Sequence, residues 1–353
     1  MPWRGLLAVV LLTPTAVVAV EPEAVRPYAN RLVPIERPAP LLADHPEWCA
    51  PLVEERHFAA PPLVEDEAAD LAVRAWRFSY NARGIVEIPN TLRGGVTALI
   101  VVHPWGIDDG QGWRTPEPAG VADFCTPRKN ALAGRHTREV VRPFVNRLRG
   151  LVDCVVYSLP GVRDPIRARC YRSFGHRPDA AERAAGAEAL KGTLAAFDYR
   201  GGALPDELSL SVRHPVRDYF RQFPGLDAGD RFDPPGFWKL PIPVTADLDV
   251  DPDDVVAYDD EGYEPLREFL HGRGVRHVLL AGYATDMCYC RTTAGYENLS
   301  RDFNVFLVGD ATLATFPASL SPREAVTAAL ALASRDQLVT QISWVRPLTE
   351  AGR

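Results

Sequence analysis

Two cysteines stand two positions apart in the stretch ATDMCYC, residues 284–290, which follows the apolar run VLLAG. The run predicts a buried strand, and Cys288 falls where the next helix is expected to begin. Unpaired backbone N–H groups and the positive end of the helix dipole meet at such a position, which favours a thiolate and stabilises a developing oxyanion. Cys288 is therefore a candidate nucleophile for acyl chemistry. The alternative is a buried thiol without chemistry, because free cysteine is among the most buried residue types.

The second cysteine of the pair is expected to have a different role. Residues two apart on a helix point about 200° away from each other, so Cys288 and Cys290 cannot both face one site. A disulfide between them is geometrically poor. Cys290 is expected to face the core or to reach Cys154 on a neighbouring strand, and a thiol–disulfide function is only a third alternative.

The elements that must position Cys288 alternate along the chain from Thr97 onward. Apolar runs such as TALIVVH, LVDCVVYSL, DDVVAY and FNVFLVGD predict buried strands. Segments with helical spacing lie between them, and single helices are expected at 285–301 and 321–336. This alternation predicts an α/β fold with a doubly wound, mainly parallel sheet and helices on both faces. The domain is expected to span 97–345, with a proline- and arginine-rich insertion near 160–235.

In such a fold, ligands bind beyond the carboxyl ends of the strands, near the point where strand order reverses. Three stretches meet this condition in the sequence. They are His103 after the first strand, the turn at 258–260 and the loop at 282–288.

The N-terminal part differs in composition from the rest. Residues 1–19 carry one positive charge and an apolar stretch, and they end in VVA, which puts small residues at the two positions that a signal peptidase reads. This predicts a cleaved signal peptide and export to the periplasm or the extracellular space. No other stretch is long and apolar enough for a stable membrane span after cleavage. Residues 20–96 form an N-terminal extension, in which a proline-rich arm is followed by two antiparallel strands, LAVRAWRFSY and GIVEIPNTL.

Export would place the six cysteines of the chain in a compartment that permits disulfides. Their pairing cannot be chosen from the sequence. A net charge of −7 argues against a nucleic-acid partner, which rewards clustered basic surface.

The stretch VLLAGYATDMCYCRTTAGYENLSRDFNVFLVGDATLA resembles the nucleophile region of the isochorismatase-like cysteine hydrolases. Their pattern is an apolar strand, Gly-x-x-Thr-Asp-x-Cys, a helix with a Thr-Ala pair, and a strand ending in Asp-Ala. The matching positions are Gly282, Thr285, Asp286, Cys288, Thr293, Ala294, Asp310 and Ala311.

The resemblance implies roles for the loop around the cysteine. Cys288 would attack the carbonyl carbon of a small amide or ureide and form an acyl intermediate that water hydrolyses. A cis peptide bond would join Tyr283 to Ala284 just before Thr285, and the amides of Ala284 and Cys288 would form the oxyanion hole.

Two of the three catalytic positions of the family are not kept. Where the family has an aspartate at the end of the first strand, this chain has His103. The position of the family's lysine falls in the turn at 258–260, which contains no lysine. His103 suits a general base beside a cysteine, with Asp259 (or its neighbour Asp260) orienting the imidazole. The alternative is a histidine that packs against Trp105 or bonds a backbone carbonyl. Trp105 and Tyr258 are expected to line the pocket.

Two functions therefore remain in view. One is an exported hydrolase that cleaves a C–N bond of a small-molecule substrate through Cys288. The other is a catalytically inactive relative that serves as a binding or structural module. No Asp-x-His pair occurs in the chain, so neither a metal site nor a cofactor is expected, and a homo-oligomer is left open.

Overall fold

The structure is a computed structural model. It describes residues 25–29, 56–59, 61–79, 84–104, 127–196, 207–222, 244–314 and 341–347. The expected signal peptide, Trp105 and a helix expected at 321–336 lie outside these ranges. Within the described part of the chain, every helix is too short or too polar to cross a bilayer.

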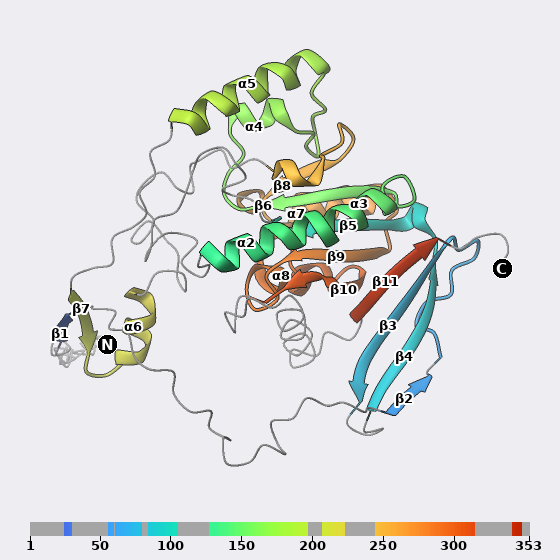
Figure 1. Ribbon diagram of the computed structural model, residues 1–353, viewed down its shortest axis with the longest axis horizontal. Coiled ribbons are helices and arrows are strands. Elements are labelled where there is room, and N and C mark those ends of the chain that lie inside the picture. The colour runs from blue at the N-terminus through green and yellow to red at the C-terminus, as the bar shows by residue number, and fades with distance from the viewer. Residues whose placement is uncertain are drawn as a thin grey trace, which may run out of the picture.

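A nine-stranded sheet forms the centre of the molecule (Figure 1). Across the sheet, its strands are β2 (Arg56–Ala59), β4 (Gly84–Leu92), β3 (Leu71–Ser79), β11 (Gln341–Pro347), β10 (Asn304–Leu313), β9 (His277–Tyr283), β5 (Thr97–Val102), β6 (Cys154–Leu159) and β8 (Val255–Tyr258).

The strands from β11 to β8 run parallel to one another. The chain proceeds outward from β5 through β6 to β8, then returns to β9 on the other side of β5 and continues to β10 and β11. Strand order therefore reverses between β5 and β9. The predicted doubly wound, mainly parallel α/β fold is confirmed, and its switch point lies between the strands that precede His103 and Cys288.

Helices cover both faces of the sheet, as expected. On one face lie α2 (Pro127–His136), the π-helical turn η3 (Thr137–Val141) and α3 (Arg142–Leu148), and on the other lie α7 (Tyr263–Gly272), α8 (Cys288–Arg291) and α9 (Tyr296–Leu299). Strand residues alternate between the two cores: Val101 packs toward α3, and Ile100 packs toward α7. Leu266 and Leu270 of α7 are fully buried because residues four apart lie on one face of a helix.

The single helix predicted over 285–301 is wrong. The segment forms two one-turn helices, α8 and α9, separated at Thr292, whose backbone is extended. Gly295 makes the tight turn possible, because a Cβ added there would lie 2.7 Å from the amide nitrogen of Thr292. A four-residue helix carries little macrodipole, so the dipole expected to assist Cys288 is small.

The N-terminal extension is part of the main sheet rather than a separate addition. β3 and β4 form the expected antiparallel hairpin, and β3 also pairs antiparallel with β11. The arm contributes β1 (Val25–Ala29), which pairs with β7 (Glu207–Ser211) of the insertion in a separate two-stranded sheet beside α6 (Pro215–Gln222), on the left of Figure 1.

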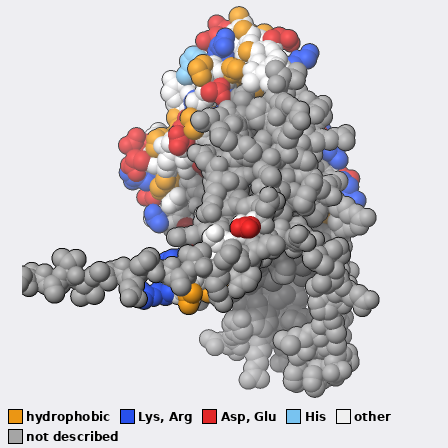
Figure 2. All heavy atoms as spheres, turned by 90° about the vertical axis from the view of Figure 1, so that its left-hand side faces the viewer, with side chains coloured by type: hydrophobic (Ala, Val, Ile, Leu, Met, Phe, Trp, Pro, Cys, Tyr) orange, Lys and Arg blue, Asp and Glu red, His pale blue; other side chains and the backbone are white. Residues whose placement is uncertain are grey.

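The insertion also carries α4 (Pro165–Cys170) and α5 (Ala180–Ala196), which pack on each other at the top of Figure 1. On the face shown in Figure 2, acidic, basic and apolar side chains are interspersed over this upper part. Three short 3₁₀ turns complete the described elements: η1 (Gly94–Val96), η4 (Ala246–Leu248) and η5 (Asp259–Glu261).

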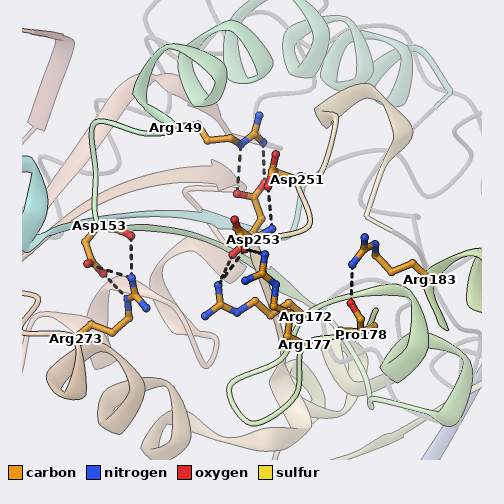
Figure 3. Close-up of polar contacts among 10 residues, drawn as sticks. Arg149, Asp153, Arg172, Arg177, Pro178, Arg183, Asp251, Asp253 and Arg273 are labelled. Atoms are coloured by element: carbon orange, nitrogen blue, oxygen red, sulfur yellow. Dashed lines mark hydrogen bonds and ion pairs between the residues drawn. The ribbon is translucent and has the colours of Figure 1, made fainter. Parts of the chain in front are cut away.

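The start of the insertion closes the outer edge of β8. The amide of Val256 donates to the carbonyl of Arg172 over 2.9 Å, and the guanidinium of Arg163 donates to the carbonyl of Val256 over 2.9 Å. Figure 3 shows Asp253, just before β8, between Arg172 and Arg177, with both of which it forms ion pairs. These bonds satisfy the edge of the sheet and fix the strand that carries Asp259.

Candidate active site

Three candidate side chains project from the same edge of the sheet. His103 directly follows β5, Asp259 begins η5 directly after β8, and Cys288 begins α8 five residues after β9 ends. Because the strands are parallel, their carboxyl ends meet at one edge, and this brings together residues far apart in the sequence.

The imidazole of His103 and the carboxylate of Asp259 form a hydrogen-bonded ion pair. Nε2 of His103 lies 2.9 Å from Oδ2 of Asp259, and the two side chains are 14% and 27% exposed. The amide of His103 donates to the carbonyl of Ser158 on the intervening strand β6. His103 has a φ of +40°, in the left-handed region that non-glycine residues seldom occupy and that is found at functional sites.

The surroundings give His103 a positive charge. Burial lowers its pKa, but the hydrogen bond to Asp259, a hydrogen bond with Cys288 and the charges of both partners outweigh burial and raise the pKa to about 10. The imidazole is therefore protonated at neutral pH. The base expected from the sequence is thus a cation at rest, placed between Asp259 and Cys288.

Only one of the two neighbouring cysteines faces this cation. Cys288 is partly exposed and interacts with His103, whereas Cys290 is buried and its thiol donates to the carbonyl of Thr285 over 3.2 Å. Both are free, as are Cys154 and Cys170. The expected core position of Cys290 is thus confirmed, and Cys290 forms no disulfide with Cys154. Burial raises the pKa of Cys154 to about 12 and that of Cys170 to about 11.

A glycine shapes the loop that leads to Cys288. Gly282 has a φ of +108°, and a Cβ added there would lie 2.0 Å from the carbonyl oxygen of Val102 on β5. Only glycine fits this backbone conformation and this close approach. The next peptide bond, between Tyr283 and Ala284, is cis, at the position that the resemblance implied.

The loop at 284–288 is held by its own backbone. The carbonyl of Ala284 accepts hydrogen bonds from the amides of Met287 (2.9 Å) and Tyr289 (3.2 Å), and the amide of Thr285 donates to the carbonyl of Leu313 on β10 over 3.1 Å. These bonds fix the two residues, Ala284 and Cys288, whose amides the resemblance assigns to an oxyanion hole.

Thr293 is a site residue whose role sequence reasoning missed. Its hydroxyl donates to the backbone carbonyl of Asp259 over 2.8 Å and so connects the segment after Cys288 to the turn that carries the carboxylate. The sequence offered a signal, because Thr293 belongs to the quoted motif, but not its partner. Two buried oxygens of the site, Oδ1 of Asp259 and Oγ1 of Thr285, have no hydrogen-bond partner.

The expected pocket wall is only partly described. Trp105 lies outside the described residues. Tyr258 does not line a pocket: it is 1% exposed and belongs to the core on the α3 face. The reason is alternation, since Tyr258 and Asp259 are consecutive at a strand end and point to opposite sides. The guanidinium groups of Arg163 and Arg167 lie 5.3 and 4.6 Å from the centre of the Tyr258 ring.

Among the residues that the structure describes, no three His, Cys, Asp or Glu side chains cluster in a way that could hold a metal ion. A second histidine, His136, is connected by a hydrogen bond to Tyr283, the residue just before the loop at 284–288. It is buried at the end of α2 and bonds the hydroxyl of Tyr283.

Residues 241–342 match the family model described as Isochorismatase domain. This range includes Asp259 and Cys288 but not His103. The match confirms the resemblance found in the motif around Cys288. No protein of curated function matches the chain.

Several solved structures are similar to the chain at low identity. A cysteine hydrolase from Pseudomonas syringae pv. phaseolicola 1448A is 18% identical, with 69% of this chain and 87% of that chain covered and a TM-score of 0.35. A pyrazinamidase/nicotinamidase from Streptococcus mutans UA159 is 16% identical, with 70% and 99% covered and a TM-score of 0.32. PnC1 from L. infantum, solved in complex with nicotinate, is 16% identical, with 70% and 92% covered and a TM-score of 0.33.

Proposed function

We propose that this chain, which carries an isochorismatase-like domain, is a cysteine hydrolase that cleaves a C–N bond in a small amide or ureide. The observation that carries the proposal is the cation at His103, held between Cys288 and Asp259. A cation beside a thiol favours the thiolate, which is the form that attacks carbonyl carbon. An inactive relative has no need to keep a protonated histidine against a free thiol.

The reaction would begin with attack by the Cys288 thiolate on the carbonyl carbon. A C–S bond forms, and the electron pair of the C=O bond moves to oxygen, where the amides of Ala284 and Cys288 would stabilise it. When this intermediate collapses, the C–N bond breaks and the protonated His103 gives its proton to the departing nitrogen. Ammonia or an amine leaves, and a thioester remains on Cys288.

The second half would use the same imidazole as a base. Neutral His103 accepts a proton from water, and the water oxygen attacks the thioester carbon. Collapse breaks the C–S bond and releases a carboxylic acid, and the thiolate and the imidazolium are restored. Asp259 orients the imidazole throughout and stabilises its charge.

The charges of this arrangement are reversed relative to the pattern of the family. That pattern places a carboxylate after the first strand and an ammonium group in the later turn, whereas this chain places an imidazolium at His103 and a carboxylate at Asp259. The pair keeps one positive and one negative group beside the cysteine. The exchange therefore supports an altered but working site rather than loss of catalysis.

Alkylation of thiols by iodoacetamide across pH, read by mass spectrometry, tests this proposal. An ordinary thiol with a pKa near 8.5 is only about 1% thiolate at pH 6.5. We expect Cys288 to react at pH 6.5 at least about tenfold faster than an ordinary thiol, and His103→Ala to remove this advantage. Cys154 and Cys170 are internal controls, because burial holds their pKa values far above neutrality.

A Cys288 that reacts no faster than an ordinary thiol would overturn the proposal and favour the inactive relative. Hydrolysis is then tested with nicotinamide and an N-carbamoyl amino acid, which represent amides and ureides, with Cys288→Ser as the blank.

We also propose that the protein acts on its small-molecule substrate after export, on the strength of the N-terminal sequence. N-terminal sequencing of the protein recovered from the cell exterior or periplasm should begin at Val20. Recovery of the full-length chain from the cytoplasm alone would contradict export.

A further inference from the structure

The hydroxyl of Tyr283 is held by two side chains from the junction of α2 and η3. It lies 2.8 Å from Nδ1 of His136 and 3.0 Å from Oγ1 of Thr137. His136 ends α2, and Thr137 begins the π-helical turn η3. All three side chains are buried, with exposed fractions of 5% or less.

The direction of each hydrogen bond follows from the count of protons. Thr137 donates its one hydroxyl proton to the carbonyl of Ala133 over 2.9 Å, so it can only accept from Tyr283. Tyr283 then uses its one proton on Thr137 and must accept from His136. Nδ1 of His136 therefore carries a proton, and the chain of donors runs from His136 through Tyr283 and Thr137 to Ala133.

Tyr283, in the middle of this chain of bonds, directly precedes the loop at 284–288. On one side of Ala284, Tyr283 is anchored by the hydrogen bonds of its hydroxyl. On the other side, Thr285 is anchored by the hydrogen bond from its amide N–H to the carbonyl of Leu313. Ala284 therefore lies between two fixed points. The π-helical turn is itself a feature that recurs at functional sites, because it moves side chains off the regular helical positions.

We propose that His136 and Thr137 are positioning residues that act through Tyr283 to hold the amide of Ala284 where the oxyanion forms. This inference rests on the proposed function. It assigns a role to a buried histidine that the reaction does not otherwise use. Neither residue contacts the reacting atoms, so their effect must appear only in steps that develop charge on the carbonyl oxygen.

Two reactions of the same thiol separate positioning from general packing. Acylation of Cys288 by 4-nitrophenyl acetate passes through an oxyanion, and the released nitrophenolate reports its rate. Alkylation by iodoacetamide is a displacement at carbon that forms no oxyanion. The ratio of the two rates therefore reads the oxyanion hole and is insensitive to the fraction of folded protein.

We expect Tyr283→Phe and His136→Ala to slow acylation by about tenfold or more, because loss of one oxyanion donor costs about 10²–10³ and a displaced donor somewhat less. Alkylation should stay within about twofold. His136→Asn should have most of the wild-type acylation rate, because its amide N–H can replace Nδ1–H. Likewise, Thr137→Ser keeps the hydroxyl and should acylate faster than Thr137→Val, which lacks it.

Tyr157→Phe is the matched control. Tyr157 is a buried tyrosine on β6 whose hydroxyl accepts from Arg149 over 3.2 Å. Arg149 also pairs with Asp254, which directly precedes β8, so this hydroxyl lies near the amino end of β8 and both rates should remain unchanged. An unchanged ratio in Tyr283→Phe and His136→Ala, or a parallel fall in both rates, would overturn the inference. A wild-type Cys288 that is inert to both reagents would instead overturn the proposed function, and the inference with it.

Discussion

The imidazole of His103 and the carboxylate of Asp259 lie 2.9 Å apart, although β6 stands between the strands that carry them. The contact is made across the end of β6, where the amide of His103 also bonds the carbonyl of Ser158. One strand end thus supplies the cation and another its counter-ion, and Cys288 approaches from a third. The chemistry proposed for the site depends on this contact.

Replacing the carboxylate should lower the pKa of His103. Burial lowers the pKa of His103, and the hydrogen bond to Asp259 is the largest influence that raises it. Asp259→Asn removes the charge behind this bond, so the pKa of His103 should fall from about 10 by about 1–3 units. NMR titration of the imidazole carbon-bound protons measures this value. Asp260→Asn is the control, because the neighbouring carboxylate makes no such bond to His103. Equal pKa values of His103 in both variants would contradict the pairing.

Thr293→Val should weaken the connection between the cysteine loop and the Asp259 turn. The substitution keeps the shape but removes one of the two donors to the carbonyl of Asp259, the other being the amide of Gly262, so the free energy of unfolding should fall by about 1 kcal/mol. Amide hydrolysis should slow as Asp259 loses its fixed position. Thr293→Ser keeps the hydroxyl and should behave like the wild type in urea unfolding and in activity. If the serine variant lost as much as the valine variant, the hydroxyl would not be the cause.

Gly282→Ala should be among the most damaging single substitutions in the chain. Its Cβ would lie 2.0 Å from the carbonyl oxygen of Val102, and its φ of +108° is unfavourable for alanine. The free energy of unfolding should fall by more than about 3 kcal/mol, as for other strained backbone positions. Gly274→Ala provides the comparison, because Gly274 has a φ of +73° but open space around it, and it should cost only about 1–2 kcal/mol. Similar losses in both variants, measured by urea unfolding, would rule out the steric cause.

Acid should loosen the contact between the N-terminal extension and the start of β9. Asp66 bonds Nε2 of His277 over 2.9 Å, and Arg276 over 2.8 Å. Burial lowers the pKa of His277. Burial raises the pKa of Asp66, but the hydrogen bond from the amide of Arg93 and the interactions with His277 and Arg276 outweigh it and lower that pKa.

Both groups therefore bind fewer protons in the folded state than in the unfolded state, so the stability that they contribute is present at neutral pH and decreases as pH falls. For His277 the loss begins as pH falls below its ordinary value near 6.5. Urea unfolding at pH 7.5 and 5.5 should show a smaller decrease in His277→Gln than in the wild type. Identical decreases would show that His277 does not contribute.

Much of the architecture was predictable from local patterns. The apolar runs specified the parallel strands because a strand buried on both faces needs apolar residues at every position. The helix at 285–301 was predicted wrongly because its composition is helical throughout, and the interruption at Thr292 depends on a backbone contact with Gly295 that no periodicity reveals. Tyr258 was placed in the pocket wall because it adjoins Asp259, but alternation at the strand end turns it into the core.

The sequence by itself determined that Cys288 follows a glycine-containing loop after a buried strand, since these features are local and each residue type has a steric or chemical reason. Only the tertiary structure decided that His103 pairs with Asp259 and is charged at rest, and that Tyr283 is held by His136 and Thr137. Strand order sets which distant side chains meet, and a pKa depends on burial and on the partners found there. Neither quantity is encoded in the spacing of residues along one chain.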